Sequence, residues 1–396
     1  MAITIKQPIQ YSKIGVLSLA HMLNDLYSNF LPQMLPFLIL INPSFTATQA
    51  AILVSSFTIT SSIIQPLIGY YLDRQGKRWF VYIGTLWMAI MLSLTGVVHG
   101  NYLLLVTLAA LAGLGTAAFH PQASTMVNIL SGSYKAVLLS TFIAFGNFGF
   151  ALGPLLLVPL FQTYGLQATL VTVIPGMLVS LLLLFFAPRI NLSSDNSSDL
   201  ASVVASVKFA AKELSAIVSV IAVRSLAYTG LLTMLPLYFQ ARNLSNIAAS
   251  HLVTIMLATG AIGGITGGFI SDMFGRKRLI VGSLVLATPL FFAFLLTHGL
   301  LSTVFLALAG AALLSSFSVT VVAAQEVIPN NKAMAAGLTL GFANGIGGLA
   351  VVLIGRVADF WGLYAAVSVL FTLPLIAGLL ALFMKDRPAA RAQRVA

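Results

Sequence analysis

Two ionisable residues lie inside long apolar stretches of this 396-residue chain. Asp25 follows Lys13 by 12 residues, and Arg224 follows Lys212 by the same number. If the stretches are membrane-spanning helices, each group lies ~18 Å into an apolar core of ~30 Å. A charge at that depth costs ~2.5–3.5 kcal/mol on insertion scales and marks functional sites. We therefore expect either a proton or substrate switch, in which protonation of Asp25 makes or breaks a pair with Arg224, or a static buried ion pair. We favour the switch, because a permanent ion pair would oppose the alternating separation of two halves of the protein.

Two histidines extend this candidate site. His21 precedes Asp25 by one helical turn, so the carboxylate would orient the imidazole for proton relay. The alternative is a satisfied polar stripe that faces a cavity. His120 precedes Pro121, whose missing N–H allows a helix to kink. His120 is therefore either a proton or substrate group or a donor that stabilises the kink.

Glu326 ends a later apolar segment. It is either a second proton-coupling carboxylate or half of a salt bridge with Lys332 or with a basic loop. Several other polar residues in apolar segments can contact substrate or make interhelical hydrogen bonds. With Arg224 and His120, the substrate-binding candidates are Asn24, Tyr27, Gln65, Asn147, Tyr228 and Asn344. We recognise no metal-ligand cluster, nucleophile–base set or soluble catalytic domain. We therefore expect no cofactor, no metal site and no enzyme activity.

The composition indicates a polytopic membrane protein. Only 7% of the residues are charged and 59% are hydrophobic, with a mean hydropathy of +1.01, whereas soluble domains carry about 25% charged residues. The net charge of +11 is spread over short loops and tails, which argues against a nucleic-acid partner. Twelve segments are long and apolar enough to span a bilayer. They are residues 14–40, 49–71, 80–98, 102–128, 137–161, 168–187, 216–239, 247–271, 279–297, 301–326, 333–358 and 363–384.

A Ser/Asn/Asp-rich stretch divides these segments into two sets of six. We expect an N-terminal bundle over residues 1–187, a linker over 188–215 and a C-terminal bundle with its tail over 216–396. Most of the 20 Lys and Arg residues fall on the side of the N-terminus; Arg242 and Arg356 lie on the other side. This asymmetry places both termini and the linker in the cytoplasm of a cell-membrane protein. We expect a monomer in the lipid bilayer.

An internal repeat relates the two sets. Gly69-Tyr-Tyr-Leu-Asp-Arg-Gln-Gly-Lys-Arg78 returns 199 residues later as Gly268-Phe-Ile-Ser-Asp-Met-Phe-Gly-Arg-Lys-Arg278. Gly165-Leu166 matches Gly362-Leu363 at an offset of 197, and Asn24 corresponds to Arg224 at an offset of 200. Because each half has an even number of segments, the halves are parallel repeats. The basic loops suit a latch of the cytoplasmic gate, formed by Gly69, Asp73, Arg74, Gly76, Arg78, Asp272, Gly275, Arg276 and Arg278.

This doubled loop in a six-plus-six chain resembles the major facilitator superfamily. Gly149-Phe-Ala-Leu-Gly153-Pro154 looks like the helix 5 signature of its antiporters. Leu19-Ala-His-Met-Leu-Asn-Asp25, Phe119-His-Pro121 and Ala324-Gln-Glu326 look like its fosmidomycin-resistance type of exporter. Two features depart from these patterns: no Arg lies between residues 100 and 134, and Gln122 stands where that type has Glu. The resemblance implies an all-α fold of two pseudo-symmetric six-helix bundles around a midplane site.

The favoured function is therefore secondary active transport, namely proton-coupled efflux of a small polar or anionic molecule or drug. Asp25 would hold the coupling proton, and Arg224 with His120 would attract an anionic substrate. The alternative is a proton-coupled uptake symporter or facilitator on the same fold. The antiporter-like signature at Gly149, Gly153 and Pro154 argues against uptake.

Overall fold

A computed structural model describes residues 10–65, 67–68, 78–131, 135–188, 200–329, 334–335 and 337–386, which form helices and short connections without a strand. The first half contains α1 (Tyr11–Ser28), α2 (Phe30–Ile41), α3 (Ala47–Ile63), α5 (Trp79–Thr95), α6 (Tyr102–Leu130), α7 (Lys135–Tyr164), the 3-10 helix η2 (Leu166–Thr172) and α8 (Val173–Phe186). The second half contains α9 (Leu200–Phe209), α10 (Ala211–Ala241), α11 (Asn246–Phe274), α12 (Arg276–Leu296), α13 (Gly299–Val327), the π-helix η4 (Gly337–Ala343) and α15 (Asn344–Ala381).

These helices confirm the predicted all-α membrane architecture. Eight helices of the described chain are long and apolar enough to cross a membrane, and α3 and α5 are shorter apolar helices. The last of the eight runs from Gly337 to Ala381 and contains the two final predicted spans. They are joined at Gly362, whose φ of 84° turns the chain back on itself. Because left-handed backbone strains residues with a Cβ, glycine suits this turn.

The first predicted span is broken into α1 and α2. Pro32 has no backbone N–H, so it cannot bond to the carbonyl of Ser28, and the helix is interrupted at Asn29. The Asn29 amide is fully buried, donates to the carbonyl of Phe150 in α7 at 2.9 Å and accepts from Gln33 at 3.2 Å. The break thus ties the first span to α7.

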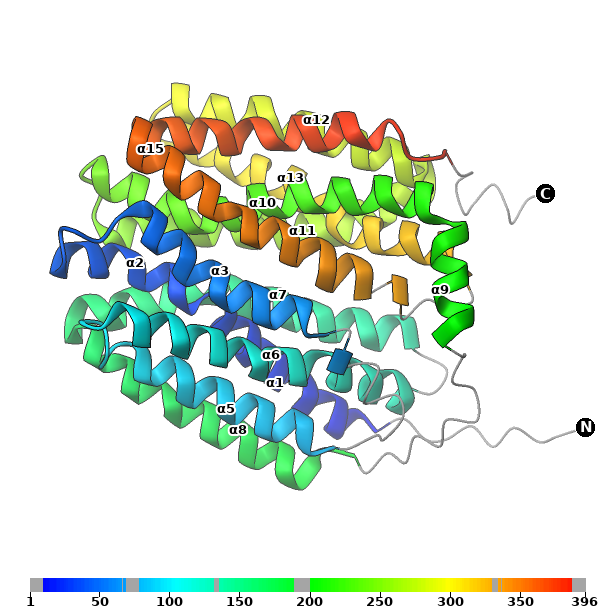
Figure 1. The fold of residues 1–396 in the computed structure, drawn as a ribbon, viewed down its shortest axis with the longest axis horizontal. Helices are drawn as coiled ribbons and strands as arrows, with labels where there is room; N and C mark the ends of the chain where they lie inside the picture. The colour runs from blue at the N-terminus through cyan, green and yellow to red at the C-terminus, as the bar shows by residue number, and fades with distance from the viewer. Residues whose placement is uncertain are drawn as a thin grey trace, which may run out of the picture.

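The helices form two groups that lie side by side (Figure 1). Helices α1 to α8 make one group, called here the N bundle, and α10 to α15 make the other, the C bundle. Helix α9 falls inside the predicted linker and lies crosswise at the end where α1 begins and α15 finishes. We call this the terminal end and the opposite end the distal end.

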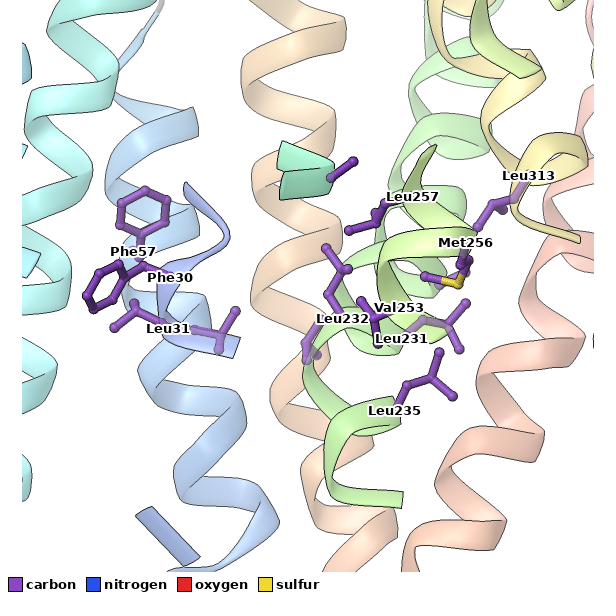
Figure 2. Packing of buried hydrophobic residues seen from close by; sticks show 14 of the residues in the cluster. Phe30, Leu31, Phe57, Leu231, Leu232, Leu235, Val253, Met256, Leu257 and Leu313 are labelled. Atoms are coloured by element: carbon purple, nitrogen blue, oxygen red, sulfur yellow. The ribbon is translucent and has the colours of Figure 1, made fainter. Parts of the chain in front are cut away.

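Each bundle has an apolar interior and an apolar exterior. Phe30 and Phe57 pack inside the N bundle, while Leu231 and Met256 pack inside the C bundle (Figure 2). Large apolar side chains such as that of Phe185 are also exposed on the outside. An apolar exterior suits a lipid environment, where helices satisfy their own backbone hydrogen bonds.

Candidate functional site

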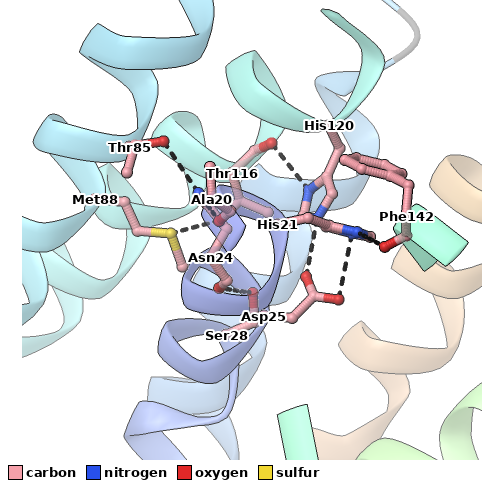
Figure 3. Close-up of polar contacts among 10 residues, drawn as sticks. All are labelled: Ala20, His21, Asn24, Asp25, Ser28, Thr85, Met88, Thr116, His120 and Phe142. Carbon is pink, nitrogen blue, oxygen red and sulfur yellow. Dashed lines mark hydrogen bonds and ion pairs between the residues drawn. The ribbon is translucent and has the colours of Figure 1, made fainter. Parts of the chain in front are cut away.

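Asp25 of α1 lies between two imidazoles (Figure 3). Its Oδ1 is 2.9 Å from Nε2 of His120 in α6, and its Oδ2 is 3.4 Å from Nε2 of His21. The side chains of Asp25 and His120 are 17% and 22% exposed, whereas that of His21 is 9% exposed. The His21 ring also stacks on the Phe142 ring of α7 at a centroid distance of 4.1 Å. Helices α1, α6 and α7 thus build one acidic–imidazole cluster.

The backbone contacts of the two imidazoles fix their tautomers. Nδ1 of His21 faces the carbonyl of Phe142 at 2.7 Å, and Nδ1 of His120 faces the carbonyl of Thr116 at 3.2 Å. A carbonyl only accepts, so each Nδ1 carries a proton and donates it. Each Nε2 then has a lone pair facing a carboxylate oxygen unless a further proton lies between them. The cluster is therefore built to hold one or two exchangeable protons.

The three side chains also place one possible ligand atom each within 4.8 Å of one another. The sequence showed no metal-ligand spacing, because His120 is 95 positions from Asp25 and reaches it only through the fold. The separation of 2.9 Å between Nε2 of His120 and Oδ1 of Asp25 is that of a hydrogen bond. We therefore interpret the cluster as a group of side chains that share protons.

Small residues of α7 bring this helix against the cluster. A Cβ added at Gly146 would lie within 3.0 Å of Oδ2 of Asp25, and one at Gly149 would meet the backbone of Met22 as closely. A Cβ at Gly153 would lie 3.1 Å from that of Asn29. The Gly149–Gly153 part of the antiporter-like motif, which ends at Pro154 inside α7, therefore packs α7 onto the helix that carries Asp25.

Arg224 of α10 lies in the C bundle and is 2% exposed. Its Nη1 donates to Oγ1 of Thr320 in α13 at 3.3 Å, and its guanidinium carbon lies 4.7 Å from the centre of the Phe317 ring. No carboxylate of the described residues lies within ion-pair distance of Arg224. A guanidinium has five N–H donors, and the bond to Thr320 uses one of them. Arg224 is therefore a buried cation without a described carboxylate partner.

The expected pair between Asp25 and Arg224 is replaced by two separate sites. Asp25 pairs with the two histidines, and Arg224 bonds to Thr320. Tyr228 lies one turn beyond Arg224 on α10. Its ring lies 6.0 Å from that of Phe150 in α7, across the junction of the bundles. Residue spacing predicts how deep a side chain lies along its helix, but it does not predict toward which neighbouring helix that side chain points.

Two other candidates lie inside the N bundle. Asn24 is fully buried and donates to the carbonyl of Ala20 at 2.9 Å and to Oγ1 of Thr85 at 3.0 Å. Tyr27 is 1% exposed and donates its hydroxyl to the carbonyl of Thr172. These contacts favour interhelical hydrogen bonding over substrate contact for both residues.

The remaining substrate candidates are partly buried. Asn344 donates to the carbonyl of Leu340 within the π-helical segment at 3.1 Å. Its own carbonyl accepts from Ser225, the neighbour of Arg224, at 3.2 Å. Gln65 follows α3, and Asn147 lies in α7. Their roles in binding stay predictions.

The second basic loop interacts within its own half. Arg276 binds Asp272, and its Nε lies 3.4 Å from Oε1 of Glu326. Of the alternatives for Glu326, this contact favours a salt bridge with the basic loop. Gly275 adopts a φ of 96° between α11 and α12, and Arg78 donates to the carbonyl of Ala187 at 3.5 Å. Lys332 and the loop residues Gly69, Asp73, Arg74 and Gly76 lie outside the described residues, so the latch of the two loops stays a prediction.

Sequence reasoning missed Thr320 and Phe317 as partners of Arg224. The internal repeat carried a signal for Phe317, because it lies 197 residues after His120. His120 meets Asp25 in the N bundle, and Phe317 meets Arg224 in the C bundle. Equivalent positions of the repeat therefore surround the two charges with different chemistry.

Comparison with known proteins gives consistent matches over almost the whole chain. A family model described as Major Facilitator Superfamily matches residues 17–350 and 217–396. The chain is 30% identical to the uncharacterized MFS-type transporter YfnC of Bacillus subtilis, over 96% of this chain and 95% of that protein. It is 28% identical to the fosmidomycin resistance protein of Escherichia coli, over 97% and 95%. A bacterial homolog of the human lysosomal transporter Spinster, solved in an inward-facing, unoccupied conformation, shares the fold with a TM-score of 0.75 and 16% identity over 95% of each chain.

Proposed function

Because the chain belongs to the major facilitator superfamily, we propose that this membrane transporter exports small anionic molecules in exchange for protons. The observation that carries the proposal is the separation of two charged sites in neighbouring bundles. Asp25 is surrounded by imidazoles, and Arg224 has no carboxylate partner among the described residues. Protons and an anion can thus occupy different places in one protein. The transporter is not an enzyme.

The proton site is the cluster of Asp25, His21 and His120. When the cluster holds two protons, each imidazole can donate from Nε2 to one carboxylate oxygen. Loss of one proton leaves a lone pair facing the carboxylate, and the contact of 3.4 Å at His21 is the weaker of the two. His120 and Asp25, joined at 2.9 Å, therefore keep the last proton. Because α1, α6 and α7 meet at this cluster, its charge can influence how these helices pack.

The anion site is centred on Arg224. The buried guanidinium offers a planar fork of donors, which matches the two oxygens of a carboxylate or phosphonate. Thr320 and Phe317 fix its position, and Tyr228, one turn further along α10, contacts Phe150 of the N bundle. A bound anion would neutralise a charge that is otherwise costly to bury. Substrate and protons would then act on opposite bundles during rocking around the midplane.

The direction of transport rests on two further observations. The Gly149–Gly153 motif packs α7 on α1 in the manner expected from its antiporter-like sequence. The relative from Escherichia coli is named for resistance to fosmidomycin, and export is one way in which a transporter can give resistance. By the positive-inside rule, the basic loops support our proposal that the terminal end faces the cytoplasm.

Flux in oriented vesicles tests the proposal. Purified transporter is reconstituted, and the inside-out fraction is given an acidic lumen with labelled fosmidomycin outside. Exchange for protons predicts accumulation in the lumen as protons leave. A neutral sugar serves as the control probe and should not accumulate. Accumulation driven instead by an acidic exterior would show symport and replace the proposal with the uptake alternative.

A further inference from the structure

Glycines of α15 close the seam with α3 along the length of that helix. Ser55 donates to the carbonyl of Gly348 at 2.7 Å. A Cβ at Gly348 would lie within 3.0 Å of Thr58, and one at Gly345 would lie 2.8 Å from Ile63. A Cβ at Gly355 would lie 2.7 Å from the backbone of α3. The two helices therefore approach closely enough to block passage along this seam.

Asp359 completes the distal end of that seam. Its Oδ1 accepts from the backbone N–H of Ala47 at 2.8 Å, and its Oδ2 accepts from that of Thr48 at 3.0 Å. These N–H groups belong to the first turn of α3, where a helix has no partners of its own. A carboxylate of the C bundle thus caps a helix of the N bundle, at the end where the helix dipole favours negative charge.

The other N–H groups of that turn are satisfied locally. Oγ1 of Thr46 accepts from the backbone N–H of Gln49 at 3.1 Å, and Oε1 of Gln49 accepts from the backbone N–H of Thr46 at 3.0 Å. The carbonyl of Thr46 accepts from Ala50 at 3.0 Å. In this first turn, only the N–H groups of Ala47 and Thr48 have no acceptor within α3, and both donate to the Asp359 carboxylate. The cap of α3 is therefore shared between the bundles.

The second seam, between α7 and α11, has an equivalent contact. Nδ2 of Asn246, the first residue of α11, lies 3.3 Å from Oε1 of Gln162 near the end of α7. Gln162 corresponds to Asp359 at the repeat offset of 197, and Asn246 corresponds to Ala47 at the offset of 199. The internal repeat thus places one contact on each seam, a charged one and a neutral one.

We propose that these contacts are a pair of unequal latches that hold the distal side of the transporter closed, with Asp359 as the stronger. Two charge-assisted hydrogen bonds to a helix N-terminus exceed one bond between neutral amides. Opening the distal side must release the Asp359 carboxylate and both N–H groups to water. The proposal depends on the interface alone and needs neither the substrate nor the coupling proton assigned above.

Distance measurements between spin labels test the latches directly. The chain has no cysteine, so Leu103→Cys and Leu300→Cys add the only two labelling sites. Both residues are exposed near the distal end, at the starts of α6 and α13 in different bundles. Asp359→Asn keeps the shape but removes the charge and one acceptor. We expect the distal-open population to rise about threefold to tenfold relative to the parent. An unchanged distance distribution would overturn the proposal.

Two further variants rank the latches and cover a folding failure. Gln162→Ala should raise the distal-open population less than Asp359→Asn does, and an equal or larger rise would overturn the ranking. Gly355→Ala adds a methyl group between α15 and α3, at the seam that Asp359 bridges. It should also raise the distal-open population. Its matched control is Gly282→Ala, because a Cβ at Gly282 meets no atom within 4 Å. If Gly355→Ala, folded and monodisperse, keeps the parent distances, the closed seam does not depend on this contact and the proposal fails.

Discussion

His120 and Asp25 come from different helices, and Nε2 of His120 lies 2.9 Å from Oδ1 of Asp25. The opposite nitrogen of the same ring is held by the carbonyl of Thr116. The imidazole is therefore oriented by the backbone and presents its second nitrogen to the carboxylate. This arrangement links a proton position to the relative placement of α1 and α6.

Asp25→Asn removes the group that both imidazoles face. We expect proton-driven accumulation of fosmidomycin to fall more than tenfold, because an amide neither ionises nor accepts the shared proton. The side chain keeps its size, so thermal unfolding of the detergent-solubilised protein should shift little. Substrate exchange without a proton gradient is the second measurement and should persist. Parental proton-driven rates in this variant would remove Asp25 from the coupling site.

The two histidines should differ in importance. His120→Gln breaks the contact of 2.9 Å, whereas His21→Gln breaks the one of 3.4 Å. We expect the His120 variant to lose more proton-driven transport than the His21 variant. The measurement is the initial rate in the same vesicles across external pH. A larger defect in the His21 variant would show that the His21–Asp25 contact is the one that carries the proton.

Arg224→Lys tests the anion site while keeping the charge. The ammonium is a point donor and cannot reproduce the planar fork, so we expect anion affinity to fall about tenfold, the equivalent of about 1.4 kcal/mol. Ligand-induced thermal stabilisation with a series of phosphonates and carboxylates measures this loss. Arg224→Met should abolish the stabilisation but leave the unliganded protein folded, because no described carboxylate loses its partner. Equal stabilisation of the Arg224→Met variant by anions would contradict the assignment.

Gly146→Ala tests the wall of the proton cluster. The added methyl group would lie within 3.0 Å of Oδ2 of Asp25 and of His21, so either α7 or the carboxylate must move. We expect a strong loss of proton-driven transport from this single methyl group. Gly15→Ala, also in the N bundle, is the matched control because its Cβ meets nothing within 4 Å. Similar rates for both variants would show that the close contact at Gly146 is not needed.

Glu326→Gln separates a structural role from a coupling role. The residue pairs with Arg276, and its side chain is 37% exposed. Ion pairs of this exposure contribute about 0–1 kcal/mol, so we expect a small loss of thermal stability. Proton-driven transport should stay near the parental rate. A coupling defect as large as that of Asp25→Asn would restore Glu326 as a second proton carrier.

The spanning helices could be predicted from the sequence because the bilayer sets the length of each span and the side on which basic loops lie. The repeat could be predicted because the two halves keep matching residues at a constant spacing. The break at Asn29 was less accessible, since Pro32 lies within a helix whose apolar pattern continues past it. The merged last two spans were separated correctly at Gly362, where the chain turns. These features depend on local chemistry, and local chemistry is visible in the sequence.

The faces of the helices could not be predicted in the same way. In a soluble protein, apolar periodicity shows which face of a helix is buried, but lipid is as apolar as a protein core. Depth alone therefore predicts Asp25 beside Arg224, and the polar side chains of Asn24 and Tyr27 alone predict substrate contacts. The structure instead turns Asn24 toward Thr85 and binds Tyr27 to Thr172. The 95 positions between Asp25 and His120 likewise leave no local signal of their contact.

The Phe317 ring has a stereochemical consequence for any ligand of Arg224. The guanidinium carbon lies over this ring, 4.7 Å from its centre, and Nη1 donates to Thr320. A ligand must therefore bind the guanidinium nitrogens that do not donate to Thr320. Coplanar approach suits a group with two oxygens in one plane and disfavours a spherical ion such as chloride. The transporter would then select by the orientation of the charged group as well as by its sign.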